Sequence, residues 1–94
     1  MAGTQTAKVV GYLPYEVDGK QLLIFKLQGN VSGGCNTEAR FAVDSSSPKF
    51  KGTQVAVITA FHTQADVTVT YATACGAWSN SWDAVLVCVG AMSC

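Results

Sequence analysis

Residues 48–72 decide the fold, because in the stretch PKFKGTQVAVITAFHTQADVTVTYA a helical pattern is followed directly by a strand pattern. In the strand pattern, valine and tyrosine alternate with threonine and alanine, as in a strand with one buried face. This alternation predicts a strand over residues 67–72. It places Tyr71 on the same inward face as Val67 and Val69.

The helical pattern covers residues 48–63. Side chains that suit a buried face recur there at helical spacing: Phe50, Thr53, Val57, Ala60 and Phe61. Ser47 followed by Pro48 is typical of a helix start, because a hydroxyl caps the first turn and proline at the first helical position loses no hydrogen bond. The β-branched residues within 54–62 leave one alternative open, in which that segment is a strand of a small β-sandwich.

Three strands are predicted before the helix. Residues 6–15 mix β-branched and aromatic side chains, and residues 21–28 alternate in their second half. The Asp18-Gly19 pair between these two segments is typical of a hairpin turn. Alternation of charged and apolar residues predicts a third strand over residues 35–43.

The end of the sequence predicts a loop over residues 75–83, which carries two tryptophans, and a largely buried strand over residues 84–90. Five strands with one helix between the third and the fourth is the order of the OB-fold, a small Greek-key barrel. We therefore predict a mainly β protein in which residues 1–94 form a single OB-fold domain.

The charge balance disfavours several functions. Among 94 residues there are six basic and six acidic side chains, while 49% of the residues are hydrophobic. Nucleic-acid affinity depends on a surplus of Lys and Arg, so zero net charge argues against a nucleic-acid-binding OB domain. Residues 84–90, the longest apolar stretch, are too few to span a bilayer, so we expect no membrane insertion. The first residues lack the pattern of a signal peptide, so secretion would require a precursor with a leader.

Four cysteines favour a secreted or periplasmic protein with two disulfides, the alternative being four reduced thiols. We prefer the pairs Cys35–Cys75 and Cys88–Cys94, because the latter two lie close together near the end of the chain. Pairing of Cys35 with Cys88 and of Cys75 with Cys94 stays open. The spacing suits no metal site, and no cofactor is expected.

Catalysis has little support in the sequence. The single histidine, His62, falls near the end of the predicted helix, where a solvated role is the usual one. Neither a Ser-His-Asp spacing, nor a pair of carboxylates, nor a glycine-rich phosphate loop is recognisable. The protein is therefore predicted not to be an enzyme.

Sugar binding is better supported, by residues 78–82 with the sequence WSNSW. A saccharide offers an apolar face and a rim of hydroxyl groups, which suits aromatic rings beside short polar side chains. The predicted glycan-binding residues of this loop are Trp78, Ser79, Asn80 and Trp82. The alternative is that either tryptophan fills one end of the barrel or packs at a subunit interface.

The sequence also resembles the B subunits of bacterial AB5 toxins, above all those of subtilase cytotoxin and of the pertussis-like and typhoid toxins. The resemblance is clearest over residues 56–71, AVITAFHTQADVTVTY, and continues at Trp78. Val9-Val10, the turn at residues 18–20 and the cysteine after the Gly/Ser loop also match, so that the resemblance loosely covers most of the chain.

This resemblance implies a homopentameric ring that binds host-cell glycans and carries an enzymatic A subunit. A family tyrosine at the end of the fourth strand matches Tyr71. The serine that sialic-acid-binding members use on the first strand falls near Ala7 here, where Thr6 offers the nearest hydroxyl, and this departure puts sialic acid in doubt as the ligand. Lys8 is a nearby cation that could contact a sugar carboxylate.

Together these observations predict a secreted, glycan-binding B subunit of an AB5-type toxin. A second hypothesis is a secreted or periplasmic structural or inhibitory protein that binds another protein and no sugar. Solution mass distinguishes the two, because only the first requires an assembly of five chains.

Overall fold

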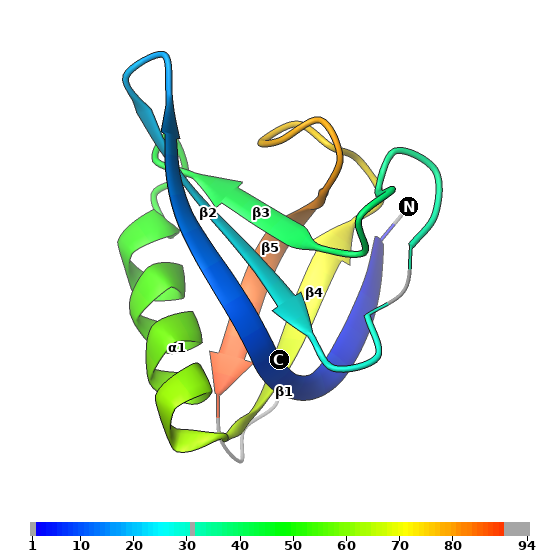
Figure 1. The fold of residues 1–94 in the computed structure, drawn as a ribbon, viewed down its shortest axis with the longest axis vertical. Helices are drawn as coiled ribbons and strands as arrows, with labels where there is room; N and C mark the ends of the chain where they lie inside the picture. Colours follow the sequence, from blue (N-terminus) through cyan, green and yellow to red (C-terminus); the bar gives the residue numbers. More distant parts are fainter. Residues whose placement is uncertain (1, 31, 90–94) are drawn as a thin grey trace.

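The computed structural model describes residues 2–30 and 32–89 (Figure 1). Within this part of the chain, five strands and one helix follow one another in the order β1, β2, β3, α1, β4, β5. Their bounds are Ala2–Val17, Lys20–Leu27, Phe41–Asp44, Phe50–Thr63, Asp66–Ala72 and Trp82–Val89. The mainly β class and the position of the helix between β3 and β4 are therefore as predicted.

The long strand β1 closes the sheet on itself. Its first half, from Ala2 to Lys8, pairs with β4, and its second half, from Val9 to Val17, pairs with β2. The register shifts between Val9 and Gly11, where the strand bends from one neighbour to the other (Figure 1). The strand order is β1-β2-β3-β5-β4, so the sheet forms a closed barrel.

The predicted hairpin between β1 and β2 is confirmed. Asp18 and Gly19 have φ angles of 53° and 76°, which are the left-handed values that a two-residue turn of this kind requires. Aspartate tolerates this region and glycine enters it without steric cost. The turn fixes the register in which Val17 faces Lys20.

The third strand is shorter than predicted. Only Phe41–Asp44 is extended, and residues 35–40 belong to the loop that precedes it. Ala39 has a φ of 54°, which interrupts a strand, and the buried Asn36 side chain accepts a hydrogen bond from the Arg40 N–H at 2.9 Å. The alternating charges in this segment therefore reflect an exposed loop.

The helix is present but begins at Phe50 rather than at residue 48. Pro48 and Lys49 lie in a turn instead, and the Ser47 hydroxyl accepts a hydrogen bond from the Lys49 N–H at 3.2 Å. The predicted helix start is therefore two residues too early, and the N-cap residue is Lys49 rather than Ser47. The β-sandwich alternative is also wrong, since the segment 54–62 is helical.

The end of the chain shows a further difference from the prediction. β4 covers Asp66–Ala72 and begins one residue before its predicted start, whereas β5 already begins at Trp82. The cause is pairing with two neighbours: Trp82 faces Phe41 of β3 in parallel, and Asp83 faces Ala72 of β4. Residue 90, the last of the predicted strand, lies outside the described residues.

The interior of the barrel is apolar and receives one face of α1. Three phenylalanines, one of them from α1, and a tryptophan supply its largest side chains. The buried core residues are Val9, Leu23, Phe25, Leu27, Phe41, Val43, Phe50, Val57, Ala60, Val67, Val69 and Trp82. Phe50, Val57 and Ala60 confirm the helix face expected from the sequence.

Candidate functional site

Three segments meet at one end of the barrel: the tip of the β1–β2 hairpin, the residues after β3, and the loop between β4 and β5 (Figure 1). The strand register brings them together, because Leu22 faces Asp44 and Ala42 faces Asp83. We call this region, comprising residues 14–22, 44–48 and 73–81, the loop end. It contains the predicted glycan-binding loop up to Ser81.

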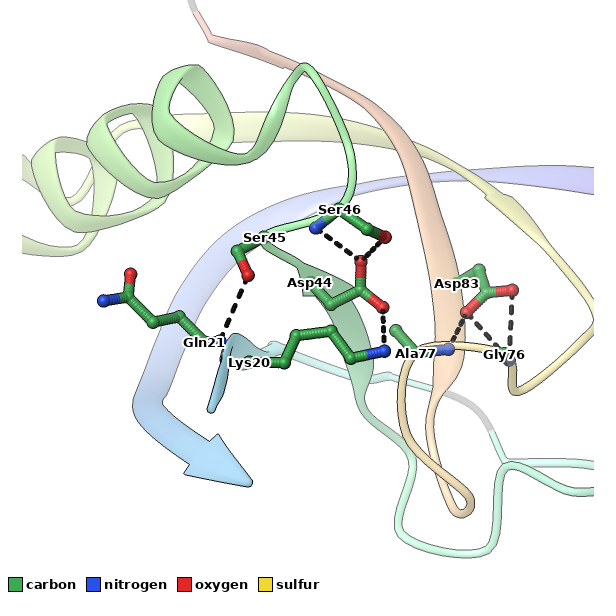
Figure 2. A network of polar contacts seen from close by, with 8 residues as sticks. All are labelled: Lys20, Gln21, Asp44, Ser45, Ser46, Gly76, Ala77 and Asp83. Atoms are coloured by element: carbon green, nitrogen blue, oxygen red, sulfur yellow. Dashed lines mark hydrogen bonds and ion pairs between the residues drawn. The ribbon is translucent and has the colours of Figure 1, made fainter. Parts of the chain in front are cut away.

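Asp44 joins the β1–β2 hairpin to the segment before the helix (Figure 2). Its carboxylate accepts hydrogen bonds from the Ser46 hydroxyl and from the Ser46 N–H, the latter at 3.1 Å, and lies 3.5 Å from the Lys20 ammonium. The Ser46 hydroxyl is the largest cause of a lowered pKa of Asp44, burial opposes it, and Lys20 adds to it. A second link runs from the Gln21 N–H to the Ser45 hydroxyl at 3.1 Å.

Asp83 orders the β4–β5 loop (Figure 2). Its carboxylate accepts the N–H of Gly76 at 3.0 and 3.2 Å and that of Ala77 at 2.9 Å. A side chain at position 76 would crowd this carboxylate, since an added Cβ would lie 3.0 Å from the Asp83 Oδ2 atom. The carboxylate therefore fixes the start of the loop by charge-assisted hydrogen bonds to the backbone.

The loop also carries the Cys35–Cys75 disulfide, which confirms one of the two preferred pairs. This bond excludes the open alternative in which Cys35 pairs with Cys88. The other preferred pair involves Cys94, which lies outside the described residues. The disulfide joins the loop before β3 to the start of the β4–β5 loop.

Trp78 lies edge-on to Tyr15, with ring centroids 5.5 Å apart and an interplanar angle of 68°. Tyr15 comes from β1 and is 47% exposed, while Trp78 is half-buried in the β4–β5 loop. A tight turn, in which the Ser81 N–H donates to the Trp78 carbonyl at 3.3 Å, holds this tryptophan in place. The sequence analysis missed Tyr15, whose only signal was its position just before the hairpin turn.

The two polar residues after Trp78 differ in their surroundings. Ser79 is exposed, whereas the Asn80 side-chain carbonyl accepts hydrogen bonds from the Arg40 guanidinium at 2.8 Å and from the Ser81 hydroxyl at 3.0 Å. Asn80 thereby ties the β4–β5 loop to the loop before β3. Its side-chain amide N–H groups are the part left for a ligand.

Trp82 does not lie in the loop, which corrects its predicted position. It is the first residue of β5, is only 8% exposed, and stacks on Tyr71 with centroids 4.9 Å apart and planes 3° apart. Tyr71 in turn packs against Phe41 at 5.2 Å. The inward orientation predicted for Tyr71 is confirmed, and Gly3 opposite it leaves room for its hydroxyl, which an added Cβ would meet at 2.5 Å.

Thr6 and Lys8 lie away from the loop end. Both are exposed on β1, where Lys8 faces Asp66 at the opposite end of β4 from the β4–β5 loop. The Lys8 ammonium contacts the Asp66 carboxylate at 3.1 Å, and the Thr6 hydroxyl lies 3.0 Å from that of Thr68. The structure therefore brings neither residue to Trp78.

A groove of about 430 Å³ opens beside Tyr15, between the hairpin and the first turns of α1. It combines an apolar floor with polar walls. Its lining residues are Pro14, Tyr15, Glu16, Gln21, Leu22, Phe50 and Gln54. A second hollow, of about 260 Å³, lies between β3 and the β4–β5 loop and includes Asp44 and Asp83.

His62 lies at the end of α1, away from both hollows. Its ring contacts Phe61, and its Nε2 atom is 3.4 Å from the Tyr12 hydroxyl. Across residues 2–30 and 32–89, no three His, Cys, Asp or Glu side chains are close enough to hold a metal ion. None of the helical residues described forms a segment long and apolar enough to cross a membrane.

Comparisons with protein-family models, with curated proteins and with solved structures gave no match. The resemblance to AB5 toxin B subunits therefore rests on the sequence pattern alone. The geometry of the loop end has to be interpreted from its own residues.

Proposed function

We propose that the protein is a secreted glycan-binding subunit that contacts sugars at its loop end. The observation that carries this proposal is the pair formed by Tyr15 and Trp78, two partly exposed rings beside a groove with polar walls. Aromatic rings that contact C–H faces, beside a few hydrogen-bonding groups, are the chemistry by which proteins hold small polar ligands.

The topology supports the finer assignment to the OB-fold. Five strands in the order β1-β2-β3-β5-β4, with a helix between β3 and β4, fit a small Greek-key barrel of that class. In that fold, the loops after the first and fourth strands commonly line the ligand site. Here Tyr15 precedes the first of these loops and Trp78 lies in the second.

Assembly into a ring of five copies with an enzymatic A subunit is the further part of the proposal suggested by the AB5 resemblance. Exposed apolar side chains support association with other chains. They are Val10 at 50%, Leu13 at 45%, Val55 at 65%, Val85 at 46% and Leu86 at 37% exposure. The same side chains also suit the second hypothesis, a secreted protein that binds another protein and no sugar.

Sedimentation and a glycan array test the two hypotheses together. A mass near five chains and binding to at least one class of glycan are expected. Trp78→Ala should weaken glycan binding roughly two- to tenfold, since an aromatic contact is worth about 0.5–1.5 kcal/mol. Lys51→Ala, at an exposed position of α1 outside the groove, is the control and should leave binding unchanged.

A monomer that binds no glycan would contradict the proposal and favour the protein-binding hypothesis. Binding that survives Trp78→Ala unchanged would show that the ligand sits elsewhere on the barrel. Near-ultraviolet circular dichroism of each variant establishes that its aromatic packing is intact.

A further inference from the structure

The groove beside Tyr15 has the volume of a small-ligand site. Its volume of about 430 Å³ falls within the range of roughly 300–1,000 Å³ that is typical of such sites. The buried side chains of Leu22 and Phe50 form an apolar floor, and the exposed ring of Tyr15 stands as one wall.

The polar walls of the groove are a carboxylate, from Glu16, and two amides, from Gln21 and Gln54. Within the described part of the chain, none of these three side chains makes a hydrogen bond or an ion pair. The carboxylate can only accept hydrogen bonds, whereas each amide both donates and accepts them. This set matches a ligand rich in hydroxyl groups.

The charge of the groove is negative. Among the described residues that line it, Glu16 is the only Asp or Glu, and none is a Lys or Arg. Lys20, the cation nearest to Glu16 in the sequence, forms an ion pair with Asp44 at 3.5 Å. The Lys49 ammonium donates to the Val85 carbonyl at 3.5 Å. Lys51 is exposed on α1 and is absent from the lining residues.

We infer that this groove binds a neutral sugar residue and discriminates against sugars that carry a carboxylate. The inference rests on the proposed glycan-binding function and specifies its ligand class. Glu16 accepts hydrogen bonds from the sugar hydroxyl groups, and the Tyr15 ring packs against a C–H face. An anionic sugar would bring a second negative charge next to Glu16 without a cation to compensate it.

In this arrangement Trp78 has a different role from Tyr15. Trp78 contacts the Tyr15 ring but is absent from the lining of the groove. It is therefore a positioning residue, which holds the Tyr15 ring upright as a wall of the groove. Trp78→Phe keeps an aromatic ring against Tyr15 and should restore most of the binding that Trp78→Ala removes.

The test uses an array of glycan pairs, in which each neutral glycan stands beside its sialylated form, followed by titration of the best pair. The neutral form should bind at least threefold more tightly, because two like charges about 6 Å apart in water change affinity by about that factor. Tyr15→Ala should weaken binding of the neutral form roughly two- to tenfold.

Glu16→Gln is the decisive variant. It should weaken binding of the neutral form about fivefold, since hydrogen bonds to an ionised acceptor are roughly twice as strong as neutral ones. It should also reduce the preference for the neutral over the sialylated form, a ratio that a merely structural role would not alter. Glu38→Gln makes the same charge change in the exposed loop before β3 and should alter neither quantity.

Nuclear magnetic resonance locates the ligand independently. The side-chain amide signals of Gln21 and Gln54 should shift when the neutral glycan is added. Those of Gln28, which lies just after β2 at the opposite end of the hairpin, should stay in place. If neutral glycan shifts Gln28 and leaves Gln21 and Gln54 unchanged, the groove is not the site.

The outcomes separate the inference from the function on which it rests. A preference for the sialylated form would overturn the inference and leave glycan binding standing. Glycan binding that is unchanged in both Tyr15→Ala and Glu16→Gln would overturn the groove as the site. Absence of binding to every glycan on the array would overturn the proposed function, and the inference with it.

Discussion

The two tryptophans are neighbours in the sequence but lie in different regions of the molecule. Trp82 is buried at the start of β5 and stacks on Tyr71, whereas Trp78 is half-buried in the β4–β5 loop and lies edge-on to the exposed Tyr15. Residue type alone therefore does not identify a sugar contact in this chain. Strand pairing assigns Trp82 to the core, and the loop leaves Trp78 at the surface.

The largest expected difference between the regions is in stability. Trp82→Ala removes a buried ring from the core and should lower the free energy of unfolding by about 3–5 kcal/mol. Trp78→Ala should lower it by no more than about 1 kcal/mol, because much of its ring is already solvated. Urea unfolding followed by far-ultraviolet circular dichroism measures both, and equal losses would contradict the distinction.

The disulfide should contribute nearly as much as Trp82. Cys35 and Cys75 are 40 residues apart, and closing a loop of that length stabilises the folded state by about 3–4 kcal/mol in the chain-entropy model. The double variant Cys35→Ser/Cys75→Ser should show this loss in the same urea experiment. A loss below about 1 kcal/mol would mean that the loop before β3 and the β4–β5 loop are held together mainly by other contacts.

Substitution of Asp83 tests whether this carboxylate, through its hydrogen bonds to the backbone, orders the loop that carries Trp78. Asp83→Ala removes the acceptor of the Gly76 and Ala77 N–H groups and should cost about 1.5–3 kcal/mol. Asp83→Asn keeps one acceptor oxygen and should cost less. Hydrogen exchange at residues 76 and 77 should accelerate in Asp83→Ala; unchanged exchange there would show that the carboxylate does not order the loop.

Asp44 should make a smaller, pH-dependent contribution. Its pKa is lowered in the folded protein from an ordinary value of 3.8, chiefly by the Ser46 hydroxyl. A carboxyl group with a lowered folded pKa stabilises the protein above the unfolded pKa and loses that contribution as the pH falls through the folded value. The free energy of unfolding should therefore drop as the pH is lowered below about 3.8.

Asp44→Asn provides the matched comparison for this pH dependence. The variant should show a shallower decline in stability over the same acidic range, because it has no carboxyl group to protonate at this position. Equal pH dependence in the wild-type and variant proteins would show that other carboxylates cause the decline.

The regular elements were predictable because their signals are local. The alternation at residues 67–72 and the spacing of Phe50, Val57 and Ala60 depend on one segment and one buried face. The Asp18-Gly19 turn is likewise specified by two residues that accept left-handed backbone angles.

The errors arise where distant contacts decide the structure. Residues 35–40 alternate like a strand, but the disulfide at Cys35 and the Asn36 contact with Arg40 hold them in a loop. The polar neighbours of Trp82 in the sequence predict a loop, and only its pairing with β3 in the folded protein places it in a strand. Tyr15 and Trp78 are far apart in the sequence and come into contact only in the folded protein. No local sequence pattern could therefore identify that pair as part of the candidate site.

The most direct test of the central claim follows the two indole N–H signals during titration with a bound glycan. The chain has two tryptophans, so each signal can be assigned by one substitution. Our account predicts that the Trp78 signal shifts, because Trp78 touches the wall of the groove, and that the Trp82 signal stays in place within the core. A shift of Trp82 alone, or of neither signal at saturating glycan, would contradict the claim that sugars bind at the loop end.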